Sequence, residues 1–123
     1  MAMAEPRDDR PSIAGLARVS LGHSELTVRP IGLGCMGMSQ FYGATDDAES
    51  IATLRAAVDM GVDFFDTSDI YGAADGTRAD IRGFEHLIGN ALADAGTRWC
   101  LATKFGARLN EDVPTVAAGG HAA

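Results

Sequence analysis

Cysteine is scarce in this sequence, and the two cysteines that it has, Cys35 and Cys100, lie far apart. Their spacing argues against a disulfide scaffold or a cysteine-ligated zinc site, and it predicts two buried thiols in a reducing compartment. Long apolar runs are missing too, because no segment approaches the roughly 20 residues that cross a bilayer. The charged start, MAMAEPRDDRPS, has no signal-peptide core. These absences predict a cytoplasmic chain that makes no membrane contact.

Basic side chains are also few, since 10 Lys and Arg residues stand against 17 Asp and Glu residues, for a net charge of -7. Nucleic acids are bound by basic surfaces, so this charge predicts that the chain has no nucleic-acid partner. The three histidines, His23, His86 and His121, show no metal-ligand spacing. We expect them on the surface or in packing positions, and we expect no metal site.

Both ends of the chain lack apolar periodicity. Residues 1–15 predict a disordered leader, and residues 109–123, which end in Ala and Gly, predict a disordered tail. Between them, the alternation over residues 17–30 around Gly22-His23-Ser24 predicts a β-hairpin. Pro30 can only begin or edge a strand, so the next strand is expected at residues 31–34.

Two amphipathic helices separate the strands that follow. Asp46 can cap a helix over residues 46–60, with Glu49 at the capping-box spacing and Gly61 as its stop. An apolar strand is expected at residues 62–66. The second helix begins near Ile81 and stops at Gly96, and the last strand covers residues 99–103. This alternation predicts an α/β fold built from βα units with a parallel sheet.

Three polar residues lie where such a repeat places active sites, at the carboxyl ends of parallel strands. Asp66 and Lys104 each end a predicted strand, and Tyr71 lies in the loop after Asp66. A tyrosine hydroxyl ordinarily has a pKa near 10, so it needs a neighbouring cation to act as a general acid at neutral pH. Lys104 would supply that cation and Asp66 would hold it. Taken singly, the same residues also fit a polar turn, a loop aromatic and a solvated strand end.

The segment GLGCMG, residues 32–37, formally fits the dinucleotide fingerprint G-x-G-x-x-G. That fingerprint requires a helix that opens within the glycines, whereas the helix signals here begin only at Asp46. A Rossmann-type dinucleotide-binding fragment therefore stays as an alternative.

Four segments together resemble the aldo-keto reductases: LGHSELTVRPIGLGCMGMSQFYG, GVDFFDTSDIYG, HLIGNAL and ATKFG. The resemblance implies the N-terminal portion of a (β/α)8 TIM barrel whose hairpin closes the bottom. It also implies reduction of small-molecule aldehydes or ketones to alcohols with hydride from NADPH. Asp66, Tyr71 and Lys104 match three members of the family's catalytic tetrad.

The resemblance further implies which residues border the cofactor. Gly34, Cys35 and Met36 match the loop that lies beside the nicotinamide ribose in this family, and Asp66 adjoins it. The long segment GAADGTRADIRG after Tyr71 is expected to reshape the substrate mouth.

Two departures from the family pattern give a second hypothesis. A barrel of this type takes about 250 residues, so residues 16–108 predict a partial barrel, truncated after about three βα units. No residue matches the tetrad histidine, which follows the lysine by about one further unit. The open sheet edges predict self-association. The alternative to an enzyme is therefore a catalytically silent remnant or interaction module.

Overall fold

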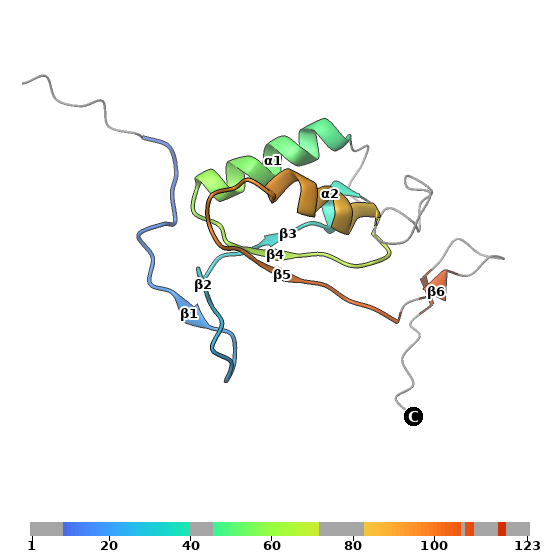
Figure 1. Ribbon diagram of the computed structural model, residues 1–123, viewed down its shortest axis with the longest axis horizontal. Helices are drawn as coiled ribbons and strands as arrows, with labels where there is room; N and C mark the ends of the chain where they lie inside the picture. The colour runs from blue at the N-terminus through green and yellow to red at the C-terminus, as the bar shows by residue number, and fades with distance from the viewer. Residues whose placement is uncertain (1–8, 40–45, 72–82, 107, 110–115, 118–123) are drawn as a thin grey trace, which may run out of the picture.

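The computed structural model describes residues 9–39, 46–71, 83–106, 108–109 and 116–117 (Figure 1). The elements in chain order are β1 (Val19–Ser20), β2 (Thr27–Val28), β3 (Leu33–Gly34), the 3-10 helix η1 (Met36–Met38), α1 (Asp47–Asp59), β4 (Phe64–Asp66), α2 (Gly83–Leu92), β5 (Cys100–Ala102), β6 (Arg108–Leu109) and β7 (Val116–Ala117). The predicted order of hairpin, strand, helix, strand, helix and strand is confirmed.

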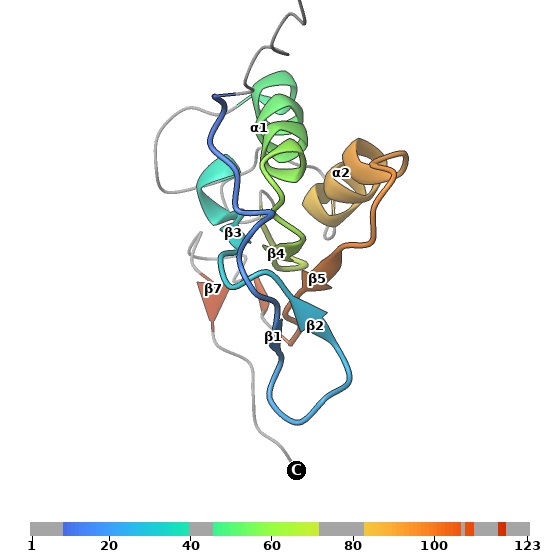
Figure 2. The ribbon, with the colours of Figure 1, turned by 90° about the vertical axis from the view of Figure 1, so that its left-hand side faces the viewer.

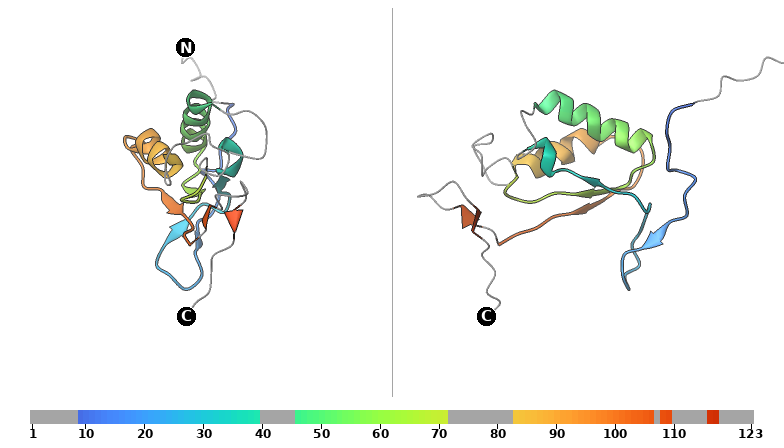
Figure 3. Two further views of the ribbon diagram at one scale, coloured as in Figure 1. Left: turned by 90° about the vertical axis from the view of Figure 1, so that its right-hand side faces the viewer. Right: turned by 180° about the vertical axis from the view of Figure 1, so that it is seen from behind.

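The central sheet has the strand order β3-β4-β5, and both pairings are parallel. Its register places Gly34 beside Asp66 and Asp66 beside Ala102. Both helices lie over one face of this sheet, and the β1-β2 hairpin lies below it at one end (Figures 2 and 3). The α/β class with parallel strands is therefore confirmed for this part of the chain.

Helix α1 begins and ends as the sequence predicts. The carboxylate of Asp46 accepts a hydrogen bond from the amide of Glu49 at 3.0 Å, which satisfies a donor that the first helical turn leaves free. Gly61 follows the helix with a φ of 97°, a conformation that suits glycine. The first turn expected for the second helix, at Ile81, lies outside the described residues.

The core lies between the helices and the sheet. Its largest fully buried side chains include Phe65 of β4, Leu54 of α1, and Phe84 and Ile88 of α2. Phe65 also meets the ring of Trp99 edge to face, with 6.2 Å between the ring centroids. The core thus joins both βα units through the middle strand.

Only one of the two thiols is buried as predicted. Cys35 is fully buried, whereas Cys100 is half-buried. Cys100 pairs in register with Phe64, and side chains in register point to the same face of a parallel sheet. Phe65, the next residue of β4, packs into the core beneath the helices, so Cys100 lies on the face that the helices leave uncovered.

Part of the expected disordered leader packs against α1. The amide of Ile13 donates a hydrogen bond to the carbonyl of Met60 at 2.7 Å, and the hydroxyl of Ser12 donates to the same carbonyl at 3.2 Å. Ala14 packs so closely that a Cβ added to Gly61 would lie 2.8 Å from the Ala14 nitrogen. A helix C-terminus offers free carbonyls to a chain that passes it. Such a contact leaves no periodicity in the sequence.

A strand pair that the sequence does not predict begins at Arg108 and continues into the expected tail, residues 109–123. Strands β6 and β7 pair antiparallel, with Arg108 beside Ala117 and Leu109 beside Val116. A pair of two-residue strands has too few positions to show an alternating pattern, so sequence periodicity misses it. The segments 110–115 and 118–123 lie outside the described residues.

The hairpin is fastened to the sheet by Asp63, the residue before β4. Its buried carboxylate pairs with the guanidinium of Arg18 at 2.7 Å and accepts a hydrogen bond from the amide of Arg29 at 2.8 Å. The Asp63 carbonyl also accepts from the amide of Cys100 at 2.7 Å. One residue therefore joins β1, β2, β4 and β5.

Replacing Asp63 by Ala is expected to lower the free energy of unfolding by about 2 kcal/mol, because a charged acceptor of two hydrogen bonds is lost. Urea unfolding followed by Trp99 fluorescence measures the change. Asp94→Ala removes an exposed acid after α2 and is the matched control, with an expected change within about 0.5 kcal/mol. Equal unfolding midpoints for the two variants would contradict the role of Asp63.

Candidate active site

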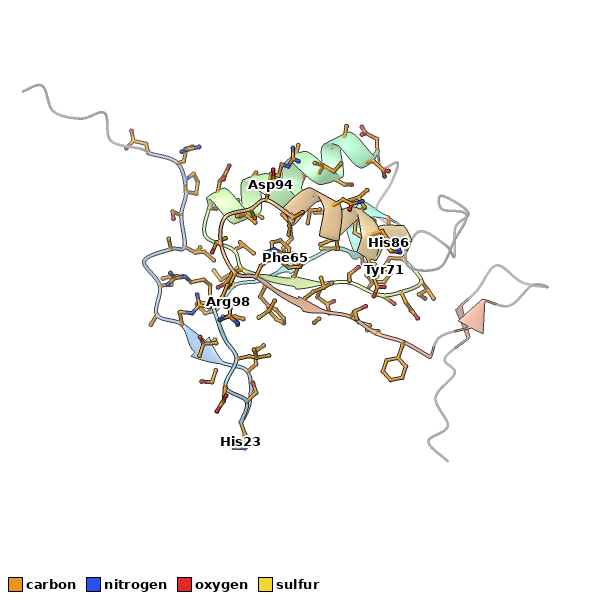
Figure 4. The ribbon with its side chains drawn as sticks, viewed as in Figure 1. His23, Phe65, Tyr71, His86, Asp94 and Arg98 are labelled. Atoms are coloured by element: carbon orange, nitrogen blue, oxygen red, sulfur yellow. The ribbon has the colours of Figure 1, made fainter. Side chains whose placement is uncertain are left out.

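The site lies where β4 and β5 end, away from the hairpin. Figure 4 labels Tyr71 at this end of the sheet and His23 at the tip of the hairpin, on the opposite side. The carbonyl of Asp66 accepts a hydrogen bond from the amide of Cys35 at 2.8 Å, and the amide of Thr67 donates one to the carbonyl of Ala102 at 2.8 Å. These bonds continue the sheet and fix the main chain at Asp66.

The ammonium of Lys104 brings the three predicted residues together. Its Nζ lies 3.0 and 2.9 Å from the two carboxylate oxygens of Asp66. It also donates to the carbonyl of Thr67 at 2.8 Å and lies 3.5 Å from the hydroxyl oxygen of Tyr71. Lys104 thus joins Asp66 to Tyr71, as the sequence predicts.

Tyr71 is held in place by a turn and by its own burial. Its amide donates to the carbonyl of Ser68 at 3.3 Å, and the residue is only 8% exposed. The Lys104 Nζ lies 5.3 Å from the centre of the tyrosine ring, within the range of a cation-π contact. The ammonium therefore contacts both the hydroxyl oxygen and the ring.

The site favours the charged form of Lys104. Partial burial works to lower the pKa of Lys104, but its hydrogen bonds with Asp66 and Tyr71 outweigh that effect, and the pKa is raised. The stabilisation from this charge is therefore complete below the ordinary lysine pKa of about 10.4. It is lost only as the pH rises through the raised value. Lys104 is an ammonium at neutral pH.

The ion pair itself adds little stability, because the side chains of Lys104 and Asp66 are 53% and 47% exposed. An arrangement that positions a cation beside a tyrosine hydroxyl without stabilising the fold is more typical of a reactive site than of a structural one.

Three of the four residues expected beside a cofactor, all except Asp66, are consecutive and differ in their exposure. Gly34 is exposed, and a Cβ added there would meet no atom within 4 Å, so there is open space next to Asp66. Met36 is half-buried and packs against the core. The Cys35 side chain is buried in the core, and its amide is bonded to Asp66. The surface at Gly34 is thus open, whereas the Cys35 thiol is enclosed.

Burial raises the pKa of the Cys35 thiol to about 11, and the nearby charge of Asp66 adds to the effect. We therefore expect iodoacetamide at pH 8 to label the half-buried Cys100 first. Cys35 should react roughly 100-fold more slowly than an ordinary thiol, because so little thiolate is present. Mass spectrometry of the Cys100→Ser variant measures this directly. Rapid labelling of that folded variant would contradict the burial of Cys35.

Sequence reasoning missed the main-chain groups at this site. The carbonyl of Thr67 holds the ammonium, and the amide of Asp69 donates to the carbonyl of Lys104 at 3.3 Å. Main-chain groups carry no sequence signal. His23 and His86 are exposed, as expected, and His121 lies outside the described residues.

Two further findings concern metals and membranes. Within the described ranges, no three His, Cys, Asp or Glu side chains gather as a metal would require. In the same ranges, every helix is too short or too polar to cross a bilayer.

A sequence model of the aldo/keto reductase family matches residues 30–121, well over half of the chain. The chain belongs to this family. The match includes the strands β3, β4 and β5. It also includes Asp66, Tyr71 and Lys104.

Solved aldo-keto reductase structures resemble the fold of this chain. The chain is 25% identical to the holo form of an aldo-keto reductase from Bacillus halodurans, with a TM-score of 0.64 over 85% of this chain and 30% of that one. Two structures of aldo-keto reductase type from Pseudomonas aeruginosa are 28% identical, with TM-scores of 0.58 and 0.59. They are matched over 80% and 79% of this chain, and over 36% and 34% of theirs. The chain thus spans about a third of the length of these reductases.

The positions of the strand and helices around residues 32–37 do not support the alternative of a Rossmann-type dinucleotide-binding fragment. Gly34 lies inside β3, only a short 3-10 helix follows at Met36–Met38, and α1 begins at Asp47. A dinucleotide fingerprint needs its α-helix to open among the glycines. Gly32 instead precedes β3, Gly34 ends it beside Asp66, and Gly37 lies in η1.

Proposed function

We propose that the chain supplies the Asp66, Tyr71 and Lys104 site of an oxidoreductase that reduces aldehydes or ketones to alcohols with hydride from NADPH. The observation that carries this proposal is the Lys104 ammonium, which binds Asp66 at 2.9 Å and reaches the Tyr71 hydroxyl oxygen at 3.5 Å. The family membership of the chain supports the same reaction class.

Tyr71 is the proton donor in this proposal. The ammonium faces the phenolic oxygen, so the hydroxyl proton is free to point toward a substrate carbonyl. As the carbonyl carbon accepts hydride, its oxygen takes the Tyr71 proton, and the O–H bond of Tyr71 breaks. Lys104 then stabilises the phenolate that remains until it regains a proton from solvent.

Asp66 keeps Lys104 in place during this transfer. Its two carboxylate oxygens accept hydrogen bonds from the Lys104 ammonium. These bonds hold the ammonium beside the Tyr71 hydroxyl. When bound, NADPH would supply the hydride, and the open surface at Gly34 next to Asp66 leaves room for it. The substrate is a small carbonyl compound, and we place the reaction in the cytoplasm.

Replacing Lys104 by Met is expected to lower the rate of NADPH-dependent aldehyde reduction at pH 7 by roughly 100-fold, because the phenolate loses its cation. The remaining activity should rise with lower pH, where the proton is more available from solvent. Initial rates between pH 5 and 9 measure both effects. An unchanged rate and pH profile would contradict the pairing of Lys104 with Tyr71.

A second candidate is an interaction module that has the same site without turnover, and the exposed Leu101 on β5, an edge strand of the three-stranded sheet, favours it. In this reading the helix-free face and the edges of the β3-β4-β5 sheet bind a second copy of the chain. Titration of the 123-residue chain with NADPH, followed by Trp99 fluorescence, separates the two. Saturable binding supports the reductase, and no binding at millimolar NADPH supports the silent module.

A further inference from the structure

One side-chain contact ties the residue before Lys104 to the start of α2. The hydroxyl of Thr103 donates a hydrogen bond to Oε1 of Glu85. Thr103 follows β5 directly, and Glu85 lies in the first turn of α2. The proposed reaction does not use this contact, and it lies outside the group formed by Asp66, Tyr71 and Lys104.

The main chain at Glu85 is held in place because the neighbouring face of α2 is in the core. Phe84 is fully buried, and Leu87 and Ile88 continue the buried face. The half-buried Glu85 side chain thus starts from a fixed main-chain position, and its hydrogen bond with Thr103 restricts its rotamers. Thr103 therefore receives a stable acceptor.

The main chain of Lys104 is held from two sides. The Glu85 contact fixes Thr103 on one side, and the amide of Asp69 donates to the Lys104 carbonyl on the other. Meanwhile, the Lys104 ammonium already binds Asp66 and the Thr67 carbonyl and only reaches Tyr71 at 3.5 Å. A small displacement of the main chain would therefore break the contact between Lys104 and Tyr71 first, because it is the longest of the three.

We propose that Glu85, acting through Thr103, is a positioning residue that sets the Lys104 ammonium against the Tyr71 hydroxyl. The proposal rests on the proposed function, in which Lys104 supports Tyr71. It adds a residue from α2 to a site otherwise formed by the ends of β4 and β5 and the loop after β4.

Lys104 is the only lysine in the chain, which allows a direct test. A chain grown with isotope-labelled lysine gives one side-chain signal by NMR, and its titration reports the pKa of Lys104 without any turnover. The raised pKa depends on the hydrogen bonds with Asp66 and Tyr71. Thr103→Val and Glu85→Ala are therefore expected to shift the titration down toward the ordinary value of about 10.4.

The conservative variants Thr103→Ser and Glu85→Gln keep a hydroxyl donor and an oxygen acceptor, so they should titrate like the native chain. The control is Thr53→Val, which removes a hydroxyl that donates to the Glu49 carbonyl on α1, away from the site. If Thr103→Val and Glu85→Ala titrate like the native chain, the proposal is overturned. It is also overturned if Thr53→Val shifts the titration as much. Because no reaction is measured, failure of the reductase assignment gives a different result, namely an inactive native chain.

Discussion

Replacing Tyr71 by Phe is expected to lower kcat for NADPH-dependent aldehyde reduction by roughly 100- to 10,000-fold, the usual contribution of a general acid. The change removes one oxygen and leaves the buried ring in place. KM for NADPH should stay nearly constant, because the lost oxygen contacts Lys104, whereas NADPH is proposed to use the open surface at Gly34. Steady-state rates at several NADPH concentrations separate the two parameters.

The ring of Tyr71 makes this experiment interpretable. Tyr71 is buried, so a substitution that removed the ring, such as Tyr71→Ala, would disturb packing as well as chemistry. Tyr71→Phe should unfold at nearly the same urea concentration as the native chain. A variant that folds normally and keeps its full kcat would show that another group donates the proton.

Replacing Phe65 by Ala is expected to destabilise the chain by about 3 to 5 kcal/mol, because a large side chain is removed from a closely packed core. Phe65 is fully buried in the middle strand and meets Trp99 edge to face. Figure 4 places it between the sheet and the helices. For a small domain, such a loss removes a large part of the total stability. Urea unfolding followed by circular dichroism measures it without relying on Trp99.

Phe105→Ala is the matched control, because it deletes the same side chain from a position that is 92% exposed. Its expected effect lies within about 0.5 kcal/mol. If both variants unfolded at the same urea concentration, the core would not be centred on Phe65.

The helices and the parallel strands could be predicted because each leaves a pattern in the sequence. Asp46 and Gly61 bracket α1, and both act through local main-chain geometry. The docking of Ser12 and Ile13 on Met60 could not be predicted in this way, since it joins segments far apart in the chain. Asp63 did leave a signal, a charge inside the apolar run VDFFD, but its partners in the hairpin depend on the tertiary fold.

The site divides in the same manner. Asp66 and Lys104 could be predicted because strand ends of parallel sheets meet at one edge, and the structure joins them at 2.9 Å. The Thr67 carbonyl and the Glu85 contact could not, because neither a main-chain oxygen nor a residue on a different helix is marked by spacing. Burial decides the case of Cys35, whose sequence neighbours do not indicate how deeply its thiol lies.

The order of the strands in the sheet has a consequence for how the site forms. The strands β3, β4 and β5 lie side by side in the same order as they follow one another along the chain, which is also the order of their synthesis. Each strand therefore pairs with one that is already synthesised, and folding can advance from the N-terminus with short loop closures. We therefore expect Asp66, which pairs with Gly34 in the sheet, to take its place on β4 first. Lys104 emerges later, at the end of β5, so its arrival beside Asp66 marks the moment when the third strand has docked in the correct register.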